Sequence, residues 1–229
     1  MNIAGLQKSS LLDYPSKIAA VVFTLGCNFR CPYCHNPNLI TAVSSEKLLD
    51  EAAVFDFLSL RKGKLDAVVV SGGEPTLQSD LENFFVKLKK LGFLTKLDTN
   101  GTNPETVQNL IDKHLVDYIA MDIKAPLEKY EEITGRKTDV EKIEKSINLI
   151  AESGVDYEFR TTVVRSQLSY EDFYQISKML NGTMKYYLQK FKPMITLDCA
   201  FKKEETYTDE EFLEIKEIMQ KNISNVFIR

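Results

Sequence analysis

The chain has 229 residues, 44% of them hydrophobic, and a formal net charge of −4. This length predicts one domain or at most two, with ample apolar material for a core. No apolar run is long enough to span a membrane, and the N-terminal stretch lacks the continuous apolar segment of a signal peptide. Scattered lysines and mild acidity argue against a nucleic-acid partner. Four cysteines, three of them clustered, do not form a disulfide framework, so we expect a reducing cytoplasm.

Apolar and β-branched runs alternate with helical patterns along the whole chain. They predict strands over residues 17–25, 65–71, 93–99, 116–123, 157–164 and 184–191, a short strand or arm over 2–8, and a terminal strand within 225–229. Cap residues and apolar stripes predict helices from Ser44 or Ser45 to about Leu60, from the Ser79-x-x-Glu82 capping box to Leu91, and onward from Asn103, Asp139, Ser169 and Thr208.

This alternation predicts a parallel α/β sheet with right-handed crossovers. The strands are nearly continuous apolar runs, as expected when both faces of a sheet are covered. Six strand–helix units are too few for a closed eight-stranded barrel, so we expect an open partial (β/α)6 barrel. We expect a single domain over residues 1–229, with its core at about 17–193 and a C-terminal helix and strand extension at about 194–229.

The densest chemical signal is the C-x3-C-x2-C spacing of Cys27, Cys31 and Cys34, which follows the strand predicted at 17–25. Three thiolates on one loop can converge on one inorganic centre and leave a fourth metal position open. Zinc in a structural site needs four ligands, but Cys199 is remote and His35 directly follows Cys34. The count therefore favours a [4Fe–4S] cluster with one iron that no protein residue ligates. Burial as a small apolar residue would explain one isolated cysteine but not this group.

These cysteines stand in a longer string, Gly26-Cys27 to His35-Asn36, with Tyr33 just before the third cysteine. The string resembles the signature of the radical S-adenosylmethionine (radical SAM) superfamily. Together with Asp13-Tyr14-Pro15 it resembles glycyl-radical-enzyme activases, in particular the activating proteins of anaerobic ribonucleoside-triphosphate reductase. The resemblance extends from about Asp13 to Pro193. It implies that S-adenosylmethionine chelates the open iron through its amine and carboxylate. One electron from the cluster then cleaves the S–C5′ bond to give a 5′-deoxyadenosyl radical.

Polar groups follow four successive predicted strands, at the edge where parallel α/β folds place their active sites. Gly72-Gly73-Glu74 offers unhindered backbone and one carboxylate, which can bind a ligand's ammonium group. A loop without any binding role could have the same sequence. The resemblance implies that this segment receives the amino group of S-adenosylmethionine. It also assigns Tyr33 and Asn100 to binding of the same cosubstrate.

Asp98 and Asp122 end neighbouring predicted strands, where two like charges are unfavourable without a neutralising cation. Lys124 is the nearest candidate in the sequence. The resemblance implies a monovalent cation, Na⁺ or K⁺, held by Asp98, Thr99, Asp122 and the carbonyl of Ala120, with Lys124 facing the methionine carboxylate or the cluster. A helix cap at Asp98 and a simple ion pair at Asp122 are equally compatible with the sequence.

Arg160 lies inside a predicted strand, where a charge needs a partner. It could bind the cosubstrate carboxylate bidentately, whereas Glu158 shares its strand face and is a poor partner. Other polar residues have weaker expectations: His35 hydrogen-bonds near the cluster, His114 interacts with a helix dipole, Gln189 and Phe191 flank adenine or simply pack, and Cys199 is a free thiol.

The leading interpretation is an enzyme that makes a glycyl radical on a protein partner, with a flavodoxin or ferredoxin-type electron donor. The first alternative is a radical SAM enzyme that acts on a small molecule or on RNA. The second is an iron–sulfur electron carrier, which the Gly72–Glu74, Asp98 and Asp122 motifs oppose, because a carrier needs no rim for an amino-acid group.

Overall fold

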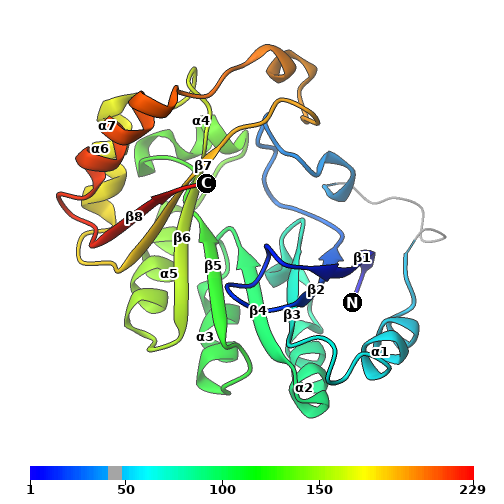
Figure 1. Ribbon diagram of the computed structural model, residues 1–229. Helices are drawn as coiled ribbons and strands as arrows, with labels where there is room; N and C mark the ends of the chain where they lie inside the picture. Colours follow the sequence, from blue (N-terminus) through cyan, green and yellow to red (C-terminus); the bar gives the residue numbers. More distant parts are fainter. Residues whose placement is uncertain (41–47) are drawn as a thin grey trace. The chain divides into compact units, whose positions relative to one another are not determined.

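The computed structural model describes residues 1–40 and 48–229, and its strands form one sheet whose order follows the chain from β1 to β8 (Figure 1). The order begins at β1 and ends at β8, so the sheet formed by the described residues is open. Its strands are β1 (Ile3–Ser10), β2 (Ala19–Thr24), β3 (Ala67–Gly72), β4 (Leu94–Thr99), β5 (Tyr118–Asp122), β6 (Asp156–Val163), β7 (Lys185–Lys190) and β8 (Asn225–Ile228). All the strands expected from the sequence are present, and the open α/β fold is confirmed.

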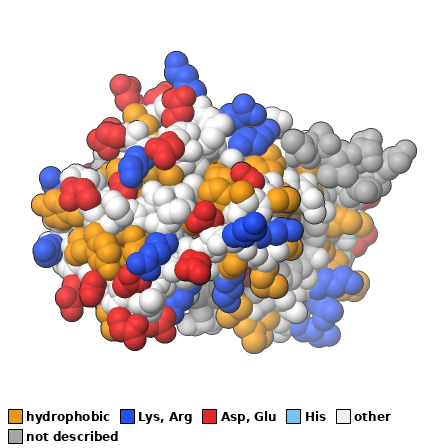
Figure 2. Space-filling view, turned by 90° about the horizontal axis from the view of Figure 1, so that it is seen from above, with side chains coloured by type: hydrophobic (Ala, Val, Ile, Leu, Met, Phe, Trp, Pro, Cys, Tyr) orange, Lys and Arg blue, Asp and Glu red, His pale blue; other side chains and the backbone are white. Residues whose placement is uncertain are grey.

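The helices alternate with these strands. They are α1 (Glu51–Ser59), α2 (Leu81–Leu91), α3 (Pro104–Asp112), α4 (Tyr130–Thr134), α5 (Val140–Glu152), α6 (Tyr170–Met179) and α7 (Asp209–Met219). Short 3₁₀ helices are η1 (Pro37–Leu39), η3 (Pro75–Leu77), η4 (Leu127–Lys129) and η5 (Cys199–Lys203). No helix in the described ranges is both long and apolar enough to cross a membrane. On the face shown in Figure 2, acidic and basic side chains are interspersed with apolar ones.

The chain divides into two compact units that are each described by themselves. The first unit comprises Met1–Asn28, Asn38–Thr99 and Asn103–Ala120, and the second comprises Phe29–Pro37, Asn100–Thr102 and Met121–Arg229. The chain passes between them several times, including once within β5.

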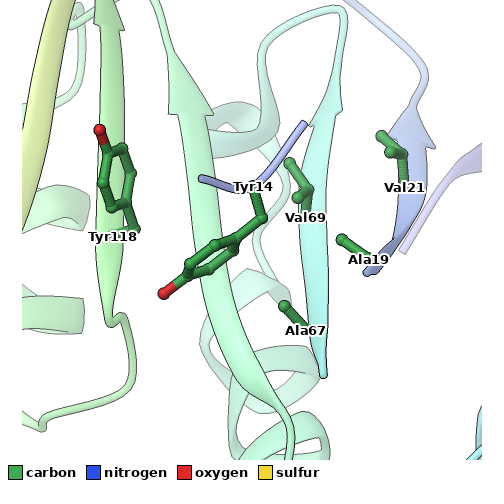
Figure 3. Close-up of a cluster of buried hydrophobic side chains, with 6 residues drawn as sticks. All are labelled: Tyr14, Ala19, Val21, Ala67, Val69 and Tyr118. Carbon is green, nitrogen blue, oxygen red and sulfur yellow. The ribbon is translucent and has the colours of Figure 1, made fainter. Parts of the chain in front are cut away.

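In the first unit, β2 pairs with β3 and β3 with β4 in parallel, as expected, whereas β1 pairs antiparallel with β2. Small residues face one another where Ala19 is in register with Ala67. In Figure 3 the ring of Tyr14 lies between these small side chains and Tyr118, and the two tyrosine rings are 5.6 Å apart. The Asp13-Tyr14-Pro15 motif thus places an aromatic ring in the core.

In the second unit, β6 pairs with β7 and β7 with β8 in parallel. Helix α5 buries the predicted stripe of Ile143, Ile147 and Ile150. Helices α6 and α7 begin with complete capping boxes at the predicted residues, Ser169 and Thr208.

Two predicted helix starts differ from the structure. Asp50 caps α1, its carboxylate accepting a hydrogen bond from the Ala52 N–H at 3.2 Å, while Ser44 and Ser45 lie outside the described residues. The capping box predicted at Ser79 is wrong, because α2 starts one residue later, after Asp80, without a side-chain cap bond. The Leu81, Phe84, Phe85 and Leu88 stripe of α2 is buried as predicted, so apolar periodicity located this helix better than its cap did.

Candidate active site

The three clustered cysteines lie on the loop after β2. Cys31 is buried, Cys27 and Cys34 are half-buried, and none forms a disulfide. The Cys34 N–H donates to the Cys31 carbonyl at 3.0 Å, which closes a tight turn between the two thiols. Burial raises the pKa of the Cys31 thiol, and the Lys124 ammonium acts against that rise.

This donor set fits an iron–sulfur cluster, because clusters take thiolate ligands and these three thiols share one short, partly desolvated loop. Within residues 1–40 and 48–229, no group of three or more His, Cys, Asp or Glu side chains is arranged to hold a metal ion as the chain stands.

In the first unit, the turn after β3 is fastened to the residue that precedes Cys27. The Glu74 N–H donates to the Gly26 carbonyl at 2.7 Å, and a Cβ at position 73 would lie 2.0 Å from that same oxygen. Gly72 has φ +119°, and a Cβ there would lie 2.4 Å from the Thr24 nitrogen. Both glycines are therefore required by close backbone approach, apart from any role in binding.

Glu74 itself is almost fully buried, with 1% of its surface exposed. Its Oε1 accepts hydrogen bonds from the Thr76 N–H at 3.1 Å, the Thr76 hydroxyl at 2.5 Å and the Thr99 hydroxyl at 2.8 Å. The carboxylate thus caps η3 and ties the end of β4 to this turn. Its predicted role toward an ammonium group stays a prediction.

Asp98 is paired with a lysine that the sequence interpretation missed. The Lys96 Nζ lies 3.0 Å from Asp98 Oδ1 and donates to the Asp13 carbonyl at 2.6 Å, while the Ser71 hydroxyl donates to Asp98 Oδ2 at 3.0 Å. Lys96 is buried on β4. The sequence contained the information needed to predict this pair, because Lys96 stands two residues before Asp98 in a predicted strand and alternate strand residues share a face.

In the second unit, Asp122 lies between two cations. Its Oδ2 is 3.0 Å from the Lys124 Nζ, and its Oδ1 accepts from the Arg160 Nε at 2.5 Å. Burial would raise the pKa of Asp122, but Arg160 and Lys124 outweigh it and hold this pKa well below its usual range. The pairing of Asp122 with Lys124 is confirmed. Asp122 is therefore the near partner that the Arg160 charge needs inside its strand. Glu158 lies farther from Arg160, with 3.9 Å between its Oε1 and the Arg160 Nη1, and the same Oε1 is only 2.7 Å from the Arg229 Nη2.

Tyr33 belongs to the same group of interacting side chains. It is buried, and burial, together with the neighbouring Cys31, raises its pKa well above the usual value, while Lys124 opposes this. The second unit therefore brings Cys31, Tyr33, Asp122, Lys124 and Arg160 into one electrostatic network.

Asn100 makes a local turn in the second unit. Its Oδ1 accepts from the Thr102 N–H at 3.1 Å and the Thr102 hydroxyl at 2.7 Å. This bonding shapes the loop that follows β4. The predicted contact of Asn100 with the cosubstrate stays a prediction.

The remaining candidates have mainly structural surroundings. The His35 Nε2 lies 3.0 Å from the Lys192 carbonyl, and its ring stacks on Phe191 with centroids 5.6 Å apart. His114 has φ +53° just after α3, the left-handed position that usually ends a helix. Gln189 is half-buried in β7, and Cys199 is an exposed thiol without a disulfide.

Comparison with known proteins agrees with these features. The family model described as the Radical SAM superfamily matches residues 21–180. A candidate glycyl-radical enzyme activating enzyme of Methanocaldococcus jannaschii is 38% identical over 236 residues, which cover 99% of this chain and 95% of that protein. A pyruvate formate-lyase-activating enzyme of Listeria monocytogenes is 38% identical over 135 residues, covering 53% of this chain and 52% of that protein.

Among solved structures, Streptococcus suis SuiB bound to S-adenosylmethionine has a TM-score of 0.68 at 17% identity. The match covers 90% of this chain and 48% of SuiB, so the chain spans about half the length of that protein, and the likeness shows the fold. With the family match and the nearly full-length relative, the chain belongs to the radical SAM superfamily, among the glycyl-radical enzyme activating enzymes.

Proposed function

We propose that this protein generates a glycyl radical on a partner enzyme, and that the partner is anaerobic ribonucleoside-triphosphate reductase. The observation that carries the activating function is the 38% identity to a candidate activating enzyme over 99% of the chain. The choice of partner rests on the resemblance of the Asp13-Tyr14-Pro15 and Gly26–Asn36 strings to activators of that reductase.

Membership of the superfamily implies a [4Fe–4S] cluster and S-adenosylmethionine. When both are bound, the reduced cluster would supply one electron to S-adenosylmethionine, whose S–C5′ bond would break to give methionine and a 5′-deoxyadenosyl radical; that radical would take a hydrogen atom from a glycine Cα, leaving 5′-deoxyadenosine and a glycyl radical. Cys27, Cys31 and Cys34 provide the three thiolate ligands. None of the three forms a disulfide and Cys31 is buried, which supports this assignment.

The chain's other residues bind and orient the cosubstrate. In this proposal the Gly72–Gly73 turn receives the methionine amine, and the Glu74 carboxylate holds that turn in place by accepting a hydrogen bond from the Thr99 hydroxyl. Lys124 and Arg160 carry positive charge for the methionine carboxylate, and Asp122 holds both side chains in place through its two oxygens. Tyr33 and Asn100 complete the predicted contacts.

A monovalent cation at Asp98, Thr99 and Asp122, with the Ala120 carbonyl, is a separate part of the proposal. The expected result is turnover that rises with added Na⁺ or K⁺, together with weaker cosubstrate binding in Asp122→Ala. Lys96 and Lys124 already face the two carboxylates. If wild-type turnover does not change with added Na⁺ or K⁺, and Asp122→Ala binds the cosubstrate as tightly as the wild type, the two carboxylates serve only in these ion pairs.

A flavodoxin or ferredoxin-type protein would supply the electron that reduces the cluster. The reaction would take place in the cytoplasm. Clustered cysteines that form no disulfide agree with a reducing compartment.

Electron paramagnetic resonance on a mixture of reduced protein, S-adenosylmethionine and the reductase tests the function. A doublet near the free-electron g value should appear on the reductase and disappear when its C-terminal glycine is changed to alanine. Chromatography of the same mixture should show 5′-deoxyadenosine. If 5′-deoxyadenosine forms but no glycyl radical signal appears on any glycyl radical enzyme tried, the result favours the small-molecule or RNA interpretation. If no 5′-deoxyadenosine forms, the result favours the electron-carrier interpretation.

A further inference from the structure

The short helix α4 and the glycine that ends it contact the cysteine loop directly, and we call Tyr130–Gly135 the α4 clamp. Although α4 has only five residues, its Tyr130, Ile133 and Thr134 side chains are almost completely buried. Gly135 ends the helix in the left-handed conformation with φ +63°. A single turn of helix contributes little stability by itself, so α4 must be held in place by the segments against which its buried side chains pack.

The clamp holds the cysteine loop through three contacts within the second unit. The Arg30 N–H donates to the Thr134 carbonyl at 2.7 Å. The Phe29 ring meets the Tyr130 ring edge-on, with centroids 6.4 Å apart. A Cβ at Gly135 would lie 3.1 Å from the Arg30 carbonyl oxygen, so the backbone of the loop rests on the glycine itself.

The same clamp holds the segment that carries Lys124. The Tyr130 hydroxyl accepts a hydrogen bond from the Lys124 N–H at 3.2 Å. The Lys124 Nζ then lies 3.0 Å from Asp122. Tyr130 thus contacts Phe29 with its ring and Lys124 with its hydroxyl, which fixes the cysteine loop relative to the end of β5.

We propose that the α4 clamp presets the backbone around Cys31 before any cluster is bound, which makes Tyr130 and Gly135 positioning residues of the site. A loop that is ordered in advance loses less conformational freedom when its thiolates become ligands. The benefit to cluster binding rests on the proposed role of the cysteines as ligands. The presetting itself can be measured without a cluster, so the two ideas can fail separately.

The test compares Gly135→Ala with Gly154→Ala in metal-free, reduced protein. Both glycines follow a helix with positive φ, but a Cβ at Gly154 would meet nothing within 4 Å. Alkylation by iodoacetamide, resolved by peptide mass spectrometry, reports how often the buried Cys31 becomes accessible, with the exposed Cys199 as an internal reference. Cys31 should react about tenfold faster in Gly135→Ala and within about twofold of wild type in Gly154→Ala, because only the first change disturbs the loop.

Asparagine at the two positions covers the case in which Gly135→Ala does not fold. Asparagine accepts positive φ more readily than alanine does, yet it still places a Cβ against Arg30. Cys31 should again react faster in Gly135→Asn than in Gly154→Asn. After reconstitution, the Gly135 variants should also release iron to a chelator several-fold faster. Equal Cys31 alkylation in the Gly135 and Gly154 variants would overturn the proposal, whatever the activity of the loaded enzyme.

Discussion

At the scale of single residues, charge is balanced locally by buried or half-buried partners. Asp98 faces Lys96, and Asp122 faces both Lys124 and Arg160. A carboxylate that leaves water needs such partners to stay ionised. The ion pairs therefore hold charged side chains in fixed directions near the predicted site.

The cluster assignment predicts a clear difference among the four cysteines. Single Cys→Ala changes at Cys27, Cys31 and Cys34 should each abolish the [4Fe–4S] cluster, because two thiolates and the cosubstrate do not hold it. Cys199→Ala is the matched control, since Cys199 is exposed at the start of η5. Iron and acid-labile sulfide are measured after anaerobic reconstitution. Cluster retained in Cys31→Ala would contradict the assignment.

Asp122→Asn should destabilise the protein, because Lys124 and Arg160 would face each other without their shared carboxylate. The expected loss is about 2 kcal/mol at pH 7, below that of a fully buried pair. The depressed pKa of Asp122 sets the pH dependence: its ionised form stabilises the fold above the unfolded-state pKa of about 3.9, and this contribution declines as pH falls further.

Urea unfolding of both proteins from pH 7 downward measures this effect. The difference between wild type and Asp122→Asn should shrink below about pH 4. Glu82→Gln, which removes the exposed partner of Lys113, should leave stability unchanged within error. A difference that stays constant down to the lowest pH at which both fold would show that the ion pairs do not stabilise the fold.

At the scale of elements, helix ends differ in how their backbone groups are satisfied. Helix α6 begins with a reciprocal box, in which the Asp172 N–H donates to the Ser169 hydroxyl at 3.3 Å and the Ser169 N–H donates to the Asp172 carboxylate at 2.7 Å. Helix α5 begins at Asp139 without a side-chain cap bond. Both starts offer a cap residue in the sequence, but only the α6 start forms a side-chain cap bond.

Ser169→Ala should therefore cost about 1 kcal/mol of unfolding free energy, as loss of a formed cap usually does. Asp139→Ala should cost clearly less, because no cap bond is lost. Urea denaturation of the two variants gives the comparison. Equal losses would mean that the α5 cap forms in solution as well.

At the scale of the whole molecule, the formal charge is −4, and acidic and basic side chains are interspersed on the face seen in Figure 2. Nucleic-acid binding depends chiefly on concentrated positive charge that displaces counterions from phosphates. The molecule's charge therefore favours a protein or small-molecule substrate over RNA.

This predicts that the protein does not bind RNA with useful affinity. Fluorescence anisotropy with labelled single-stranded and hairpin RNA at about 150 mM salt should show no saturable binding below about 10⁻⁴ M. A basic RNA-binding protein run in parallel verifies the assay. Saturable, salt-dependent binding at micromolar concentrations would favour the RNA alternative over the glycyl radical function.

The sequence alone determined the features that depend on neighbouring residues. The spacing of Cys27, Cys31 and Cys34 predicted three ligands for one inorganic centre, and the string around them resembled the superfamily signature that the family match then confirmed. Apolar periodicity placed the strands and helices, because all these signals are local along the chain. The caps at Ser169 and Thr208 were readable for the same reason.

Only the tertiary structure decided which distant groups meet. It paired β1 antiparallel with β2, brought the Lys96 ammonium to the Asp13 carbonyl and the Arg160 guanidinium to Asp122, and let the Arg30 N–H donate to the Thr134 carbonyl. A strand pattern shows which side chains share a face, but not which cation from another strand contacts a carboxylate, as the Arg160 Nε on β6 contacts Asp122 Oδ1 at the end of β5 at 2.5 Å. Those distances follow from strand register and from loops that return over many residues, which the packing of the whole chain fixes.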